Sequence, residues 1–428
     1  MRVELKYGRN GLQVELPDDA TVIWPREVAG LPNEAEAILN ALAAPIGTAP
    51  LAEKLKPSDS VAIVFSDITR PMPSDRVLPV LLQEIERVVP HEQIVLINGT
   101  GTHVANTRDE LIGMLGREIV ERYRVINHDA FDSDSLVDLG VTPQGHRALV
   151  NRTYYEADFR IVTGFIEPHI FAGFSGGPKA VLPAVAGIES IMDNHGYAML
   201  DDPRTTWGVR DGNPIWEEIR DFARMAPPHF LLNVTLNRLG QITGVFAGDV
   251  EAAHAQGCAM VRETAMVPVE QRYDVVLTTN SGYPLDINLY QTIKGISAAA
   301  QVIEPGGSIV VASECRGGVP DYGEYRNLVM EGGTPDGILE LICAPGFRRH
   351  DQWEAQLHAN LMKMAQIHVY SSGLTPEQTR EMLFDPVDDV EATVRQELQR
   401  HGQNARDGRG ARLLVLPEGS QSIPYLSE

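Results

Sequence analysis

One stretch in the middle of the chain contains side chains whose types and spacing could carry out chemistry. An apolar run at 159–162 predicts a buried strand, and a loop of small residues follows it at 173–178. His169, Lys179 and His195 lie in or near this loop. Open α/β sheets bind ligands where a strand is followed by a Gly-rich loop and a helix. Two imidazoles and one amine at such a place indicate a site of chemistry, but the stretch alone does not say which chemistry.

Each of these three side chains also has a structural interpretation. His169 follows the extended dipeptide Glu167-Pro168, so it lies on a loop and could be a surface residue. Lys179 could be a partly buried nucleophile of lowered pKa, or a solvated or phosphate-binding lysine. His195 could bind a metal as a single imidazole. No HExxH, second histidine at i+4 or nearby cysteine completes a metal site built by the protein.

Two further loops with polar or charged side chains follow apolar runs. SDITRP at 66–71 can hydrogen-bond a ribose or phosphate, and its Arg70 can bind a carboxylate or phosphate bidentately. A capped turn with a surface arginine would give the same pattern. NGTGTH at 98–103 allows close backbone approach and ends in His103, but it lacks GxGxxG and a Walker lysine. Because the carboxyl ends of parallel strands share one edge of a sheet, these loops are expected to converge.

Length and composition bound the fold and its partners. The chain has 428 residues, 43% hydrophobic and 22% charged, as in globular proteins of about two domains. A net charge of −22 argues against nucleic acid or an anionic membrane surface as a partner, and an anionic substrate would need a locally basic pocket. No apolar run approaches the roughly 20 residues of a membrane span. The N-terminus lacks a signal-peptide core, so we expect a cytoplasmic protein. Cys258, Cys315 and Cys343 form no CxxC pair and are expected to be small buried residues.

Short apolar strands alternate with helices, which predicts an α/β fold with mainly parallel sheets. We expect an N-terminal α/β domain at 1–270 and a smaller C-terminal α/β domain at 271–428. The first 24 residues are expected to form a hairpin at the start of the first domain. An antiparallel pair is expected at 230–236 and 242–247.

A helix predicted at 287–303 in the second domain carries Gln291 and Lys294. Their i, i+3 spacing places them on one face of the helix. A cation facing a cleft could offset the charge of an acid substrate, but a solvated face would also look like this.

Taken together, five segments resemble the nickel-dependent lactate racemase family. They are SDITRP (66–71), GTGTH (99–103), PHIFAGFSGGPK (168–179), NHG (194–196) and YQTIKG (290–295). Each is weak alone, but the five in this order are specific, and the resemblance covers nearly the whole chain. It implies two α/β domains with the active site in the cleft between them.

The resemblance also implies a cofactor. The family carries a nickel-pincer nucleotide, a pyridinium mononucleotide whose two thioacid sulfurs bind nickel, one of them joined to a lysine as a thioamide. Lys179 matches that lysine, and His195 matches the single histidine that completes the square plane of Ni(II). Asp67, Thr69 and Arg70 fall in the cofactor-contacting loop. Cofactor maturation proteins are implied partners, and the apo form is expected without them.

The reaction implied by the resemblance is racemisation or epimerisation of a 2-hydroxy acid by proton-coupled hydride transfer to the cofactor. His103 and His169 match the two bases that serve the two enantiomers. Arg70, Gln291 and Lys294 match the substrate-holding positions and would supply the basic pocket. Lactate is one candidate substrate; malate, longer acids and sugar acids are others.

Two alternative functions stand beside the racemase. An NAD-type 2-hydroxyacid dehydrogenase needs a GxGxxG with an acidic residue about 20 positions on, and the sequence contains none. A non-enzymatic nucleotide- or carboxylate-binding protein would use Lys179 and Arg70 as anion clamps, and its histidines would be incidental. Trp353 matches either a tryptophan that lines the family's cleft or an ordinary core residue.

Overall fold

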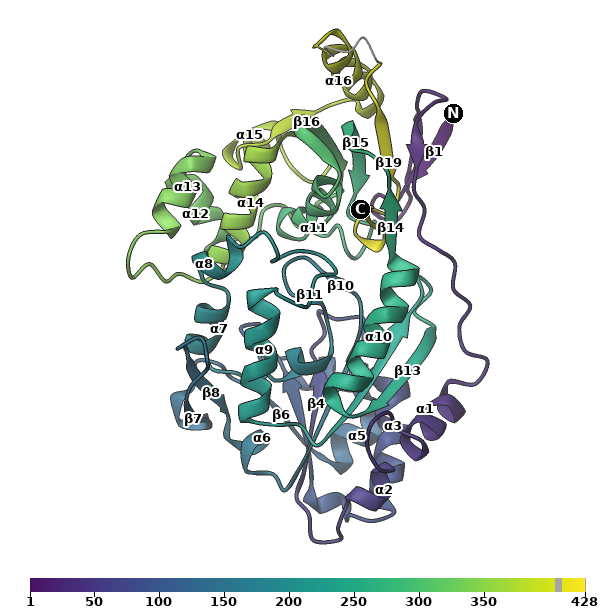
Figure 1. The fold of residues 1–428 in the computed structure, drawn as a ribbon, viewed down its shortest axis with the longest axis vertical. Helices are drawn as coiled ribbons and strands as arrows, with labels where there is room; N and C mark the ends of the chain where they lie inside the picture. The colour runs from purple at the N-terminus through teal and green to yellow at the C-terminus, as the bar shows by residue number, and fades with distance from the viewer. Residues whose placement is uncertain (405–409, 428) are drawn as a thin grey trace. The chain divides into compact units, whose positions relative to one another are not determined.

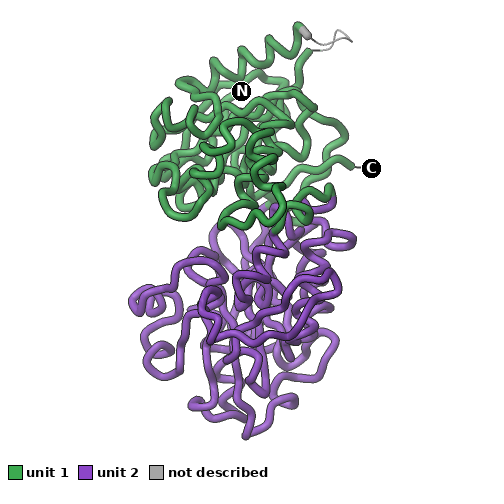
Figure 2. The backbone as a smooth tube through the Cα atoms, turned by 90° about the vertical axis from the view of Figure 1, so that its left-hand side faces the viewer, with its two compact units in different colours: residues 1–26, 196–203, 263–428 green, residues 27–195, 204–262 purple. Residues whose placement is uncertain are grey.

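The computed structural model describes residues 1–404 and 410–427. The chain forms two compact units (Figure 2), and each is built from more than one segment. Unit 1 contains Met1–Arg26, Gly196–Pro203 and Glu263–Glu428, and unit 2 contains Glu27–His195 and Arg204–Arg262. The expected single boundary after residue 270 therefore differs from the division into units. The first 26 residues belong to the same unit as the C-terminal part of the chain.

Unit 2 is built on a six-stranded sheet with the order β13-β12-β9-β4-β5-β6 (Figure 1). All neighbours pair in parallel except β12 and β13. The strands are β4 (Val61–Ser66), β5 (Ile94–Gly99), β6 (Arg124–Asn127), β9 (Phe159–Phe165), β12 (Phe230–Leu236) and β13 (Ile242–Gly248). The first five residues of β4, VAIVF, are all buried, as expected of a central parallel strand covered on both faces. The prediction of the antiparallel pair is also confirmed.

The helices of unit 2 pack apolar side chains against this sheet. On α3 the buried residues Val77, Leu78, Leu81, Leu82 and Ile85 recur at helical spacing and join the core with side chains of β4 and β5. The helices are α1 (Glu34–Ala43), α2 (Leu51–Lys54), α3 (Ser74–Glu86), α4 (Arg108–Leu115), α5 (Arg117–Arg122), α6 (Arg152–Glu156), α7 (Ile188–Asn194), α9 (Pro214–Met225) and α10 (Val250–Ala265).

Two hairpins in unit 2 were not predicted. One joins β7 (Leu136–Val141) to β8 (Arg147–Asn151). The other is very short and joins β10 (Pro168–His169) to β11 (Gly173–Phe174) inside the central motif. A two-residue strand has too few residues to show a period-2 pattern, so the sequence carries no signal for it.

Unit 1 contains a second six-stranded sheet, with the order β18-β17-β16-β15-β19-β3 and all neighbours parallel. Its strands are β3 (Thr21–Val22), β15 (Tyr273–Thr279), β16 (Ile303–Ala312), β17 (Ala365–Tyr370), β18 (Asp385–Val387) and β19 (Leu413–Leu416). With the sheet of unit 2, this confirms the prediction of an α/β fold with mainly parallel sheets.

The N-terminal hairpin joins the core of unit 1. Its strands β1 (Arg2–Leu5) and β2 (Leu12–Glu15) were predicted from their alternating pattern. Val3 and Leu5 on β1 pack in one cluster with Val275 of β15 and Val415 of β19. The segment β14 (Met266–Val269), which was not predicted as a strand, pairs in parallel with β20 (Ile423–Leu426).

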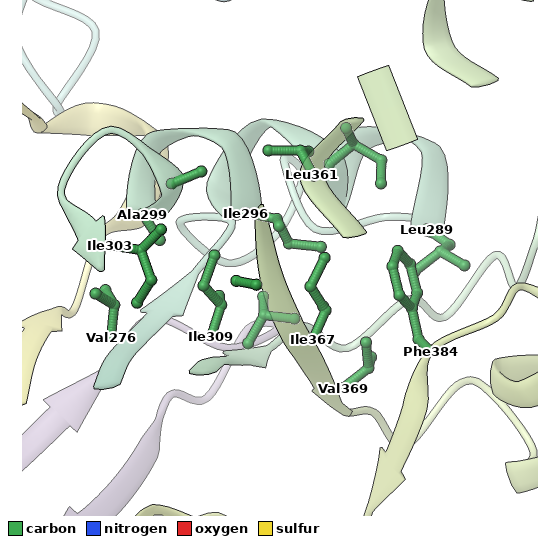
Figure 3. Close-up of a cluster of buried hydrophobic side chains, with 14 of the residues drawn as sticks. Val276, Leu289, Ile296, Ala299, Ile303, Ile309, Leu361, Ile367, Val369 and Phe384 are labelled. Atoms are coloured by element: carbon green, nitrogen blue, oxygen red, sulfur yellow. The ribbon is translucent and has the colours of Figure 1, made fainter. Parts of the chain in front are cut away.

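A second cluster of unit 1 lies between its helices and strands (Figure 3). It brings Leu289, Ile296 and Ala299 of α11 (Leu289–Ala300) against strand residues such as Ile309 and Ile367. The other helices are α8 (Tyr197–Leu200), α12 (Tyr325–Gly332), α13 (Pro335–Ile342), α14 (Gln352–Met364), α15 (Pro376–Glu381) and α16 (Val390–Asn404).

Three details of unit 1 correct the sequence analysis. The helix predicted at 287–303 spans Leu289–Ala300 as α11, and residues 305–307 lie inside β16. Parallel pairing of Gly307 with Ala365 on β17 extends the strand through them. Cys258 in unit 2 and Cys315 in unit 1 are buried as expected, but Cys343 of unit 1 is exposed.

Candidate active site

Three of the predicted loops leave neighbouring strands of unit 2. In its sheet β4 lies between β9 and β5, and all three are parallel. The loops at 66–71, at 99–103 and after β9 therefore start from the same edge. The structure brings Asp67, Thr69 and His103 into direct contact there.

His103 is paired with a buried carboxylate. Its Nδ1 lies 2.8 Å from Oδ2 of Asp67, and the Thr69 hydroxyl donates to Oδ1 of the same carboxylate at 2.8 Å. Burial alone would raise the pKa of Asp67, but the hydrogen bond and charge of His103, together with Arg70, outweigh it and lower that pKa. A carboxylate only accepts, so Nδ1 of His103 carries a proton, and in the neutral form of the ring Nε2 has the lone pair. The His103 side chain is 44% exposed, which makes Nε2 suited to act as a base.

Nδ1 of His169 accepts hydrogen bonds, whereas Nδ1 of His103 donates one. It lies on the β10–β11 hairpin, and the backbone N–H groups of Ala172 and Phe171 donate to its Nδ1 at 3.2 Å and 3.4 Å. A ring nitrogen that accepts cannot carry the proton, so neutral His169 has its proton on Nε2. The two neutral imidazoles thus present different groups, a lone pair on His103 and an N–H on His169.

Phe171 connects His169 to His195. Its ring is nearly perpendicular to the His169 ring, with 4.6 Å between centroids, and to the His195 ring, with 5.0 Å between centroids. His195 is buried and follows the last turn of α7. Burial, and after it the charge of Lys179, lower the pKa of His195 to about 3. The ring is therefore neutral, which is the form that binds a metal.

Lys179 lies on a single 3-10 turn, Gly177–Ala180, that follows the glycine loop. Gly176 and Gly177 have φ of +75° and +58°, a backbone region that favours glycine. The residue is half-buried. Burial, and after it the positive charge of Arg70, lower the pKa of Lys179 to about 7. The lowered pKa lets the amine lose its proton near neutral pH, so Lys179 can act as a nucleophile.

Electrostatic and ring contacts therefore join the site residues predicted in unit 2. The positive charge of Arg70 lowers the pKa values of both Asp67 and Lys179, and the charge of Lys179 lowers the pKa of His195. The Arg70 N–H also donates to the backbone carbonyl of Asp67 at 3.1 Å. One cation, one reactive amine and three imidazoles are thereby gathered in one region of unit 2.

The donor set decides what kind of metal centre could form here. Within the described residues, no group of three or more His, Cys, Asp or Glu side chains is arranged to hold a metal ion. His195 can supply one neutral nitrogen. These residues fit a metal that arrives with its other donors on a cofactor, and Lys179 is an amine to which a cofactor could be attached.

Gln291 and Lys294 lie on α11 of unit 1, both half-buried. Trp353 of α14 is buried, and its Nε1–H donates to the Tyr290 hydroxyl at 3.2 Å. Burial raises the pKa of the neighbouring Glu354 to about 8, although Lys294 acts against that rise. The roles of Gln291 and Lys294 as substrate ligands stay predictions.

Sequence reasoning missed an asparagine network that supports the first two loops. Buried Asn98 donates to Oδ1 of both Asn106 and Asn127, at 2.8 Å each. Asn106 Oδ1 also accepts from the backbone N–H of Ile68 at 3.3 Å. The network thus ties the residue after Asp67 to the end of β5. Three asparagines scattered over 30 positions form no motif, so only their position after strands could have suggested them.

The fold and the site define an α/β protein of two compact units, with a histidine- and lysine-bearing site at the carboxyl edge of one parallel sheet. Two family models match the chain. The model of the lactate racemase N-terminal domain matches residues 7–208, and that of the lactate racemase C-terminal domain matches residues 269–423.

Individual proteins agree with the family models. The chain is 34% identical to the lactate racemase of Thermoanaerobacterium thermosaccharolyticum over 394 residues, covering 91% of this chain and 92% of that protein. It is also 34% identical to the lactate racemase of Lactiplantibacillus plantarum over 388 residues, covering 90% of each. The structure of the lactate racemase apoprotein from T. thermosaccharolyticum matches with a TM-score of 0.90 at 32% identity and covers 100% of both chains. A Thermotoga maritima protein shares the fold, with a TM-score of 0.69 at 19% identity over 94% of this chain and 100% of that one.

The chain belongs to the lactate racemase family, as the five motifs predicted. The relatives from T. thermosaccharolyticum and L. plantarum are lactate racemases, and this confirms the assignment of the chain to a family of isomerases.

Proposed function

We propose that this chain racemises lactate or a closely related 2-hydroxy acid, using a nickel-pincer nucleotide carried on Lys179. The observation that supports the proposal most is the grouping of Lys179, Arg70 and His195. A nucleophilic amine with a pKa of about 7 lies within electrostatic reach of both the guanidinium and a neutral buried imidazole. Membership of the lactate racemase family favours this activity over the dehydrogenase and the non-enzymatic binding protein.

In this proposal Lys179 holds the cofactor covalently and His195 is the protein ligand to nickel. The cofactor, when bound, supplies the acceptor for the hydride of the substrate's α-carbon. Soft sulfur donors and one imidazole are a set that suits Ni(II). Asp67 and Thr69 contact the cofactor, and Asp67 also orients His103 through the bond of 2.8 Å.

The chain's own residues manage the carboxylate and the protons. Arg70 binds the substrate carboxylate, and Gln291 and Lys294 are the further substrate ligands we propose. His103 takes the hydroxyl proton of one enantiomer at Nε2. His169 serves the other enantiomer, since racemisation needs a proton acceptor on each side of a flat 2-keto acid. To accept at Nε2, His169 must move its own proton to Nδ1 and give up the backbone bonds from Phe171 and Ala172.

We further propose that the protein works in the cytoplasm and depends on cofactor maturation proteins. No helix among residues 1–404 and 410–427 has the length and apolar character that crossing a bilayer requires. Malate and other 2-hydroxy acids remain substrates to be tested beside lactate.

The test uses the full chain co-produced with the cofactor-making enzymes. Intact-mass and nickel analysis should find one adduct on Lys179 and about one nickel per chain, both lost in Lys179→Met. A chiral assay over a panel of 2-hydroxy acids should then identify the substrate. Absence of both adduct and nickel from the wild-type protein would overturn the proposal.

A further inference from the structure

A buried histidine that the proposed reaction does not use lies behind the glycine loop. His254 is on α10 of unit 2 and is fully buried. Burial lowers its pKa to about 3, although its bond to the backbone of Ser175 acts against that. His254 is therefore neutral throughout the working pH range. A neutral buried imidazole that stays fixed can act as a structural support for the loop in front of it.

The ring of His254 packs directly against the segment that carries Lys179. A Cβ atom added to Gly177 would lie 2.6 Å from Cγ of His254, which is closer than real side chains approach. Gly177 is therefore pressed against the ring, and its N–H donates to Oδ1 of Asn233 at 2.8 Å. Lys179 lies only two residues further along the same 3-10 turn. The face of the His254 ring thus fixes the position from which the Lys179 side chain starts.

The polar edge of the same ring supports a different part of the site. Nε2 of His254 lies 2.8 Å from the Ser175 carbonyl, which can only accept, so Nε2 carries the proton. Ser175 in turn is bound to Glu167, the residue before β10: the Glu167 N–H donates to the Ser175 hydroxyl at 2.9 Å, and the Ser175 N–H donates to the Glu167 carbonyl at 2.9 Å. Hydrogen bonds through Ser175 thereby link His254 to the start of the β10–β11 hairpin.

The other side of the His254 ring is held firmly. Trp216 of α9 stacks on it with 5.0 Å between ring centroids and 17° between planes. The guanidinium carbon of Arg210 lies 5.1 Å from the Trp216 ring centroid. Cys258, one turn along α10, places its sulfur 3.4 Å from Nε2 and 3.6 Å from Nδ1 of His254, and burial raises the pKa of Cys258 to about 12, so this thiol stays protonated. With both faces and both nitrogens in contact, the ring has one orientation.

We propose that His254 is a positioning residue of the active site with two separable functions. Its ring face sets the position of Lys179 through Gly177, and its Nε2–H sets the position of the His169 hairpin through Ser175. This inference rests on the proposed function only in assigning roles to Lys179 and His169. The placement of both segments by His254 comes from the contacts above.

Two substitutions separate the two functions. His254→Gln keeps an N–H donor but removes the ring from behind Gly177. His254→Phe keeps an aromatic ring but removes the donor to Ser175. His358 of α14 provides the matched control, because it is also fully buried, stacks on Phe384 at 4.4 Å and has its Nδ1 within 2.8 Å of the Tyr325 hydroxyl. It belongs to unit 1, so His358→Gln and His358→Phe should lower the melting temperature without affecting either readout.

The first readout is the nucleophilicity of Lys179 in the cofactor-free full chain. Competitive labelling with acetic anhydride across pH, followed by peptide mass spectrometry, gives the midpoint of the Lys179 titration. We expect His254→Gln to raise the midpoint by about one pH unit or more towards the ordinary lysine value of ~10.4. His254→Phe should leave it within about half a unit of wild type.

The second readout is kcat for lactate per nickel-loaded chain. We expect His254→Phe to lower kcat about tenfold or more with a smaller change in KM, because a displaced base misses its near-attack position. If neither His254 variant differs from the His358 controls in either readout, the proposal is wrong. The proposal is also wrong if both variants fold and His254→Phe, rather than His254→Gln, raises the Lys179 midpoint while His254→Gln alone lowers kcat. The labelling needs no cofactor or turnover, so it tests the Lys179 function of His254 even if the chain proves not to be a racemase.

Discussion

His103 and His169, the two histidines of the site that are not buried, differ in the hydrogen-bond partner of Nδ1. The Asp67 carboxylate accepts from His103, whereas backbone N–H groups donate to His169. Neutral His103 is therefore ready to take a proton at Nε2, and neutral His169 is not. His195, buried and kept neutral, has a third environment and suits a metal rather than a proton. One residue type thus supplies three different chemical groups, because each imidazole has different neighbours.

This difference leads to a prediction for single substitutions. His103→Ala and His169→Ala should each lower kcat by roughly 10²–10⁴-fold while nickel content stays near one per chain, because each removes a proton acceptor. His195→Ala should instead lower nickel retention. His91→Ala, on the surface of unit 2, is the control and should change neither. Full nickel content in His195→Ala would contradict the ligand assignment.

Lys179 gives the cofactor-free protein a characteristic pH dependence. Its pKa is about 7 in the folded chain and ~10.4 when unfolded, so between these values the unfolded state binds more protons. Stability contributed by Lys179 should therefore rise as pH increases from about 7 to about 10. The difference in melting temperature between wild type and Lys179→Met should change in favour of wild type over this window.

Attachment of a cofactor would remove the titrating amine and with it this pH dependence. Lys56→Met, at an exposed position of the same unit, serves as the control and should show a constant difference from wild type across the window. An equally constant difference for Lys179→Met would contradict the lowered pKa.

At the scale of elements, a glycine allows a helix to pack closely against the end of a strand. Gly295 lies in the interior of α11, and a Cβ there would be 2.1 Å from the Thr279 carbonyl oxygen at the end of β15. Gly113 lies in the interior of α4 and has no other atom within 4 Å of such a Cβ. The two glycines look alike in sequence, but only Gly295 is required by packing.

The same substitution should therefore have opposite effects at these two sites. Gly113→Ala should stabilise the protein by ~0.5–1 kcal/mol, because alanine loses less backbone entropy in a helix. Gly295→Ala should destabilise it by about 1–3 kcal/mol, because the methyl group forces α11 away from β15. Thermal unfolding of both variants measures the difference, and a stable Gly295→Ala protein would contradict this packing.

At the scale of the whole molecule, the order of the chain does not match the division into units. The hairpin at residues 2–15 packs into the core of unit 1, although unit 2 follows it in sequence from Glu27 onward. Gly196–Pro203 likewise belongs to unit 1 although it directly follows His195. Long-range packing, rather than sequence proximity, decides which unit a segment joins.

A pair of core substitutions tests this division. Leu5→Ala should cost ~2–5 kcal/mol and raise hydrogen exchange in β15 and β19, because Leu5 is fully buried in their cluster. Leu51→Ala is matched in chemistry and burial but should raise exchange in β4 and β5, with which Leu51 shares a core. Exchange mass spectrometry reads out both. Faster exchange in β4 after Leu5→Ala, with β15 unchanged, would contradict the assignment.

The sequence by itself determined the strands at the centre of the unit 2 sheet, the N-terminal hairpin and the types of side chain that the site contains. The five buried residues of β4 and the alternating β1 and β2 were predictable because strand periodicity depends on neighbours one or two residues away. The position of Lys179 and His103 after strands was predictable for the same reason. The extent of α11 was not, because residues 305–307 lie in β16, where Gly307 pairs in parallel with Ala365 of β17.

Only the tertiary structure decided the pKa values and the orientations of these side chains. Asp67 and His103 are 36 residues apart, and His254 bonds to Ser175 across 79 residues. Burial and charge at Lys179 likewise depend on Arg70, from a different loop. Protonation and orientation depend on the few atoms within a few ångströms in space, whereas sequence patterns report neighbours along the chain. The residue types of the site were therefore open to prediction, and their proton states and supports were not.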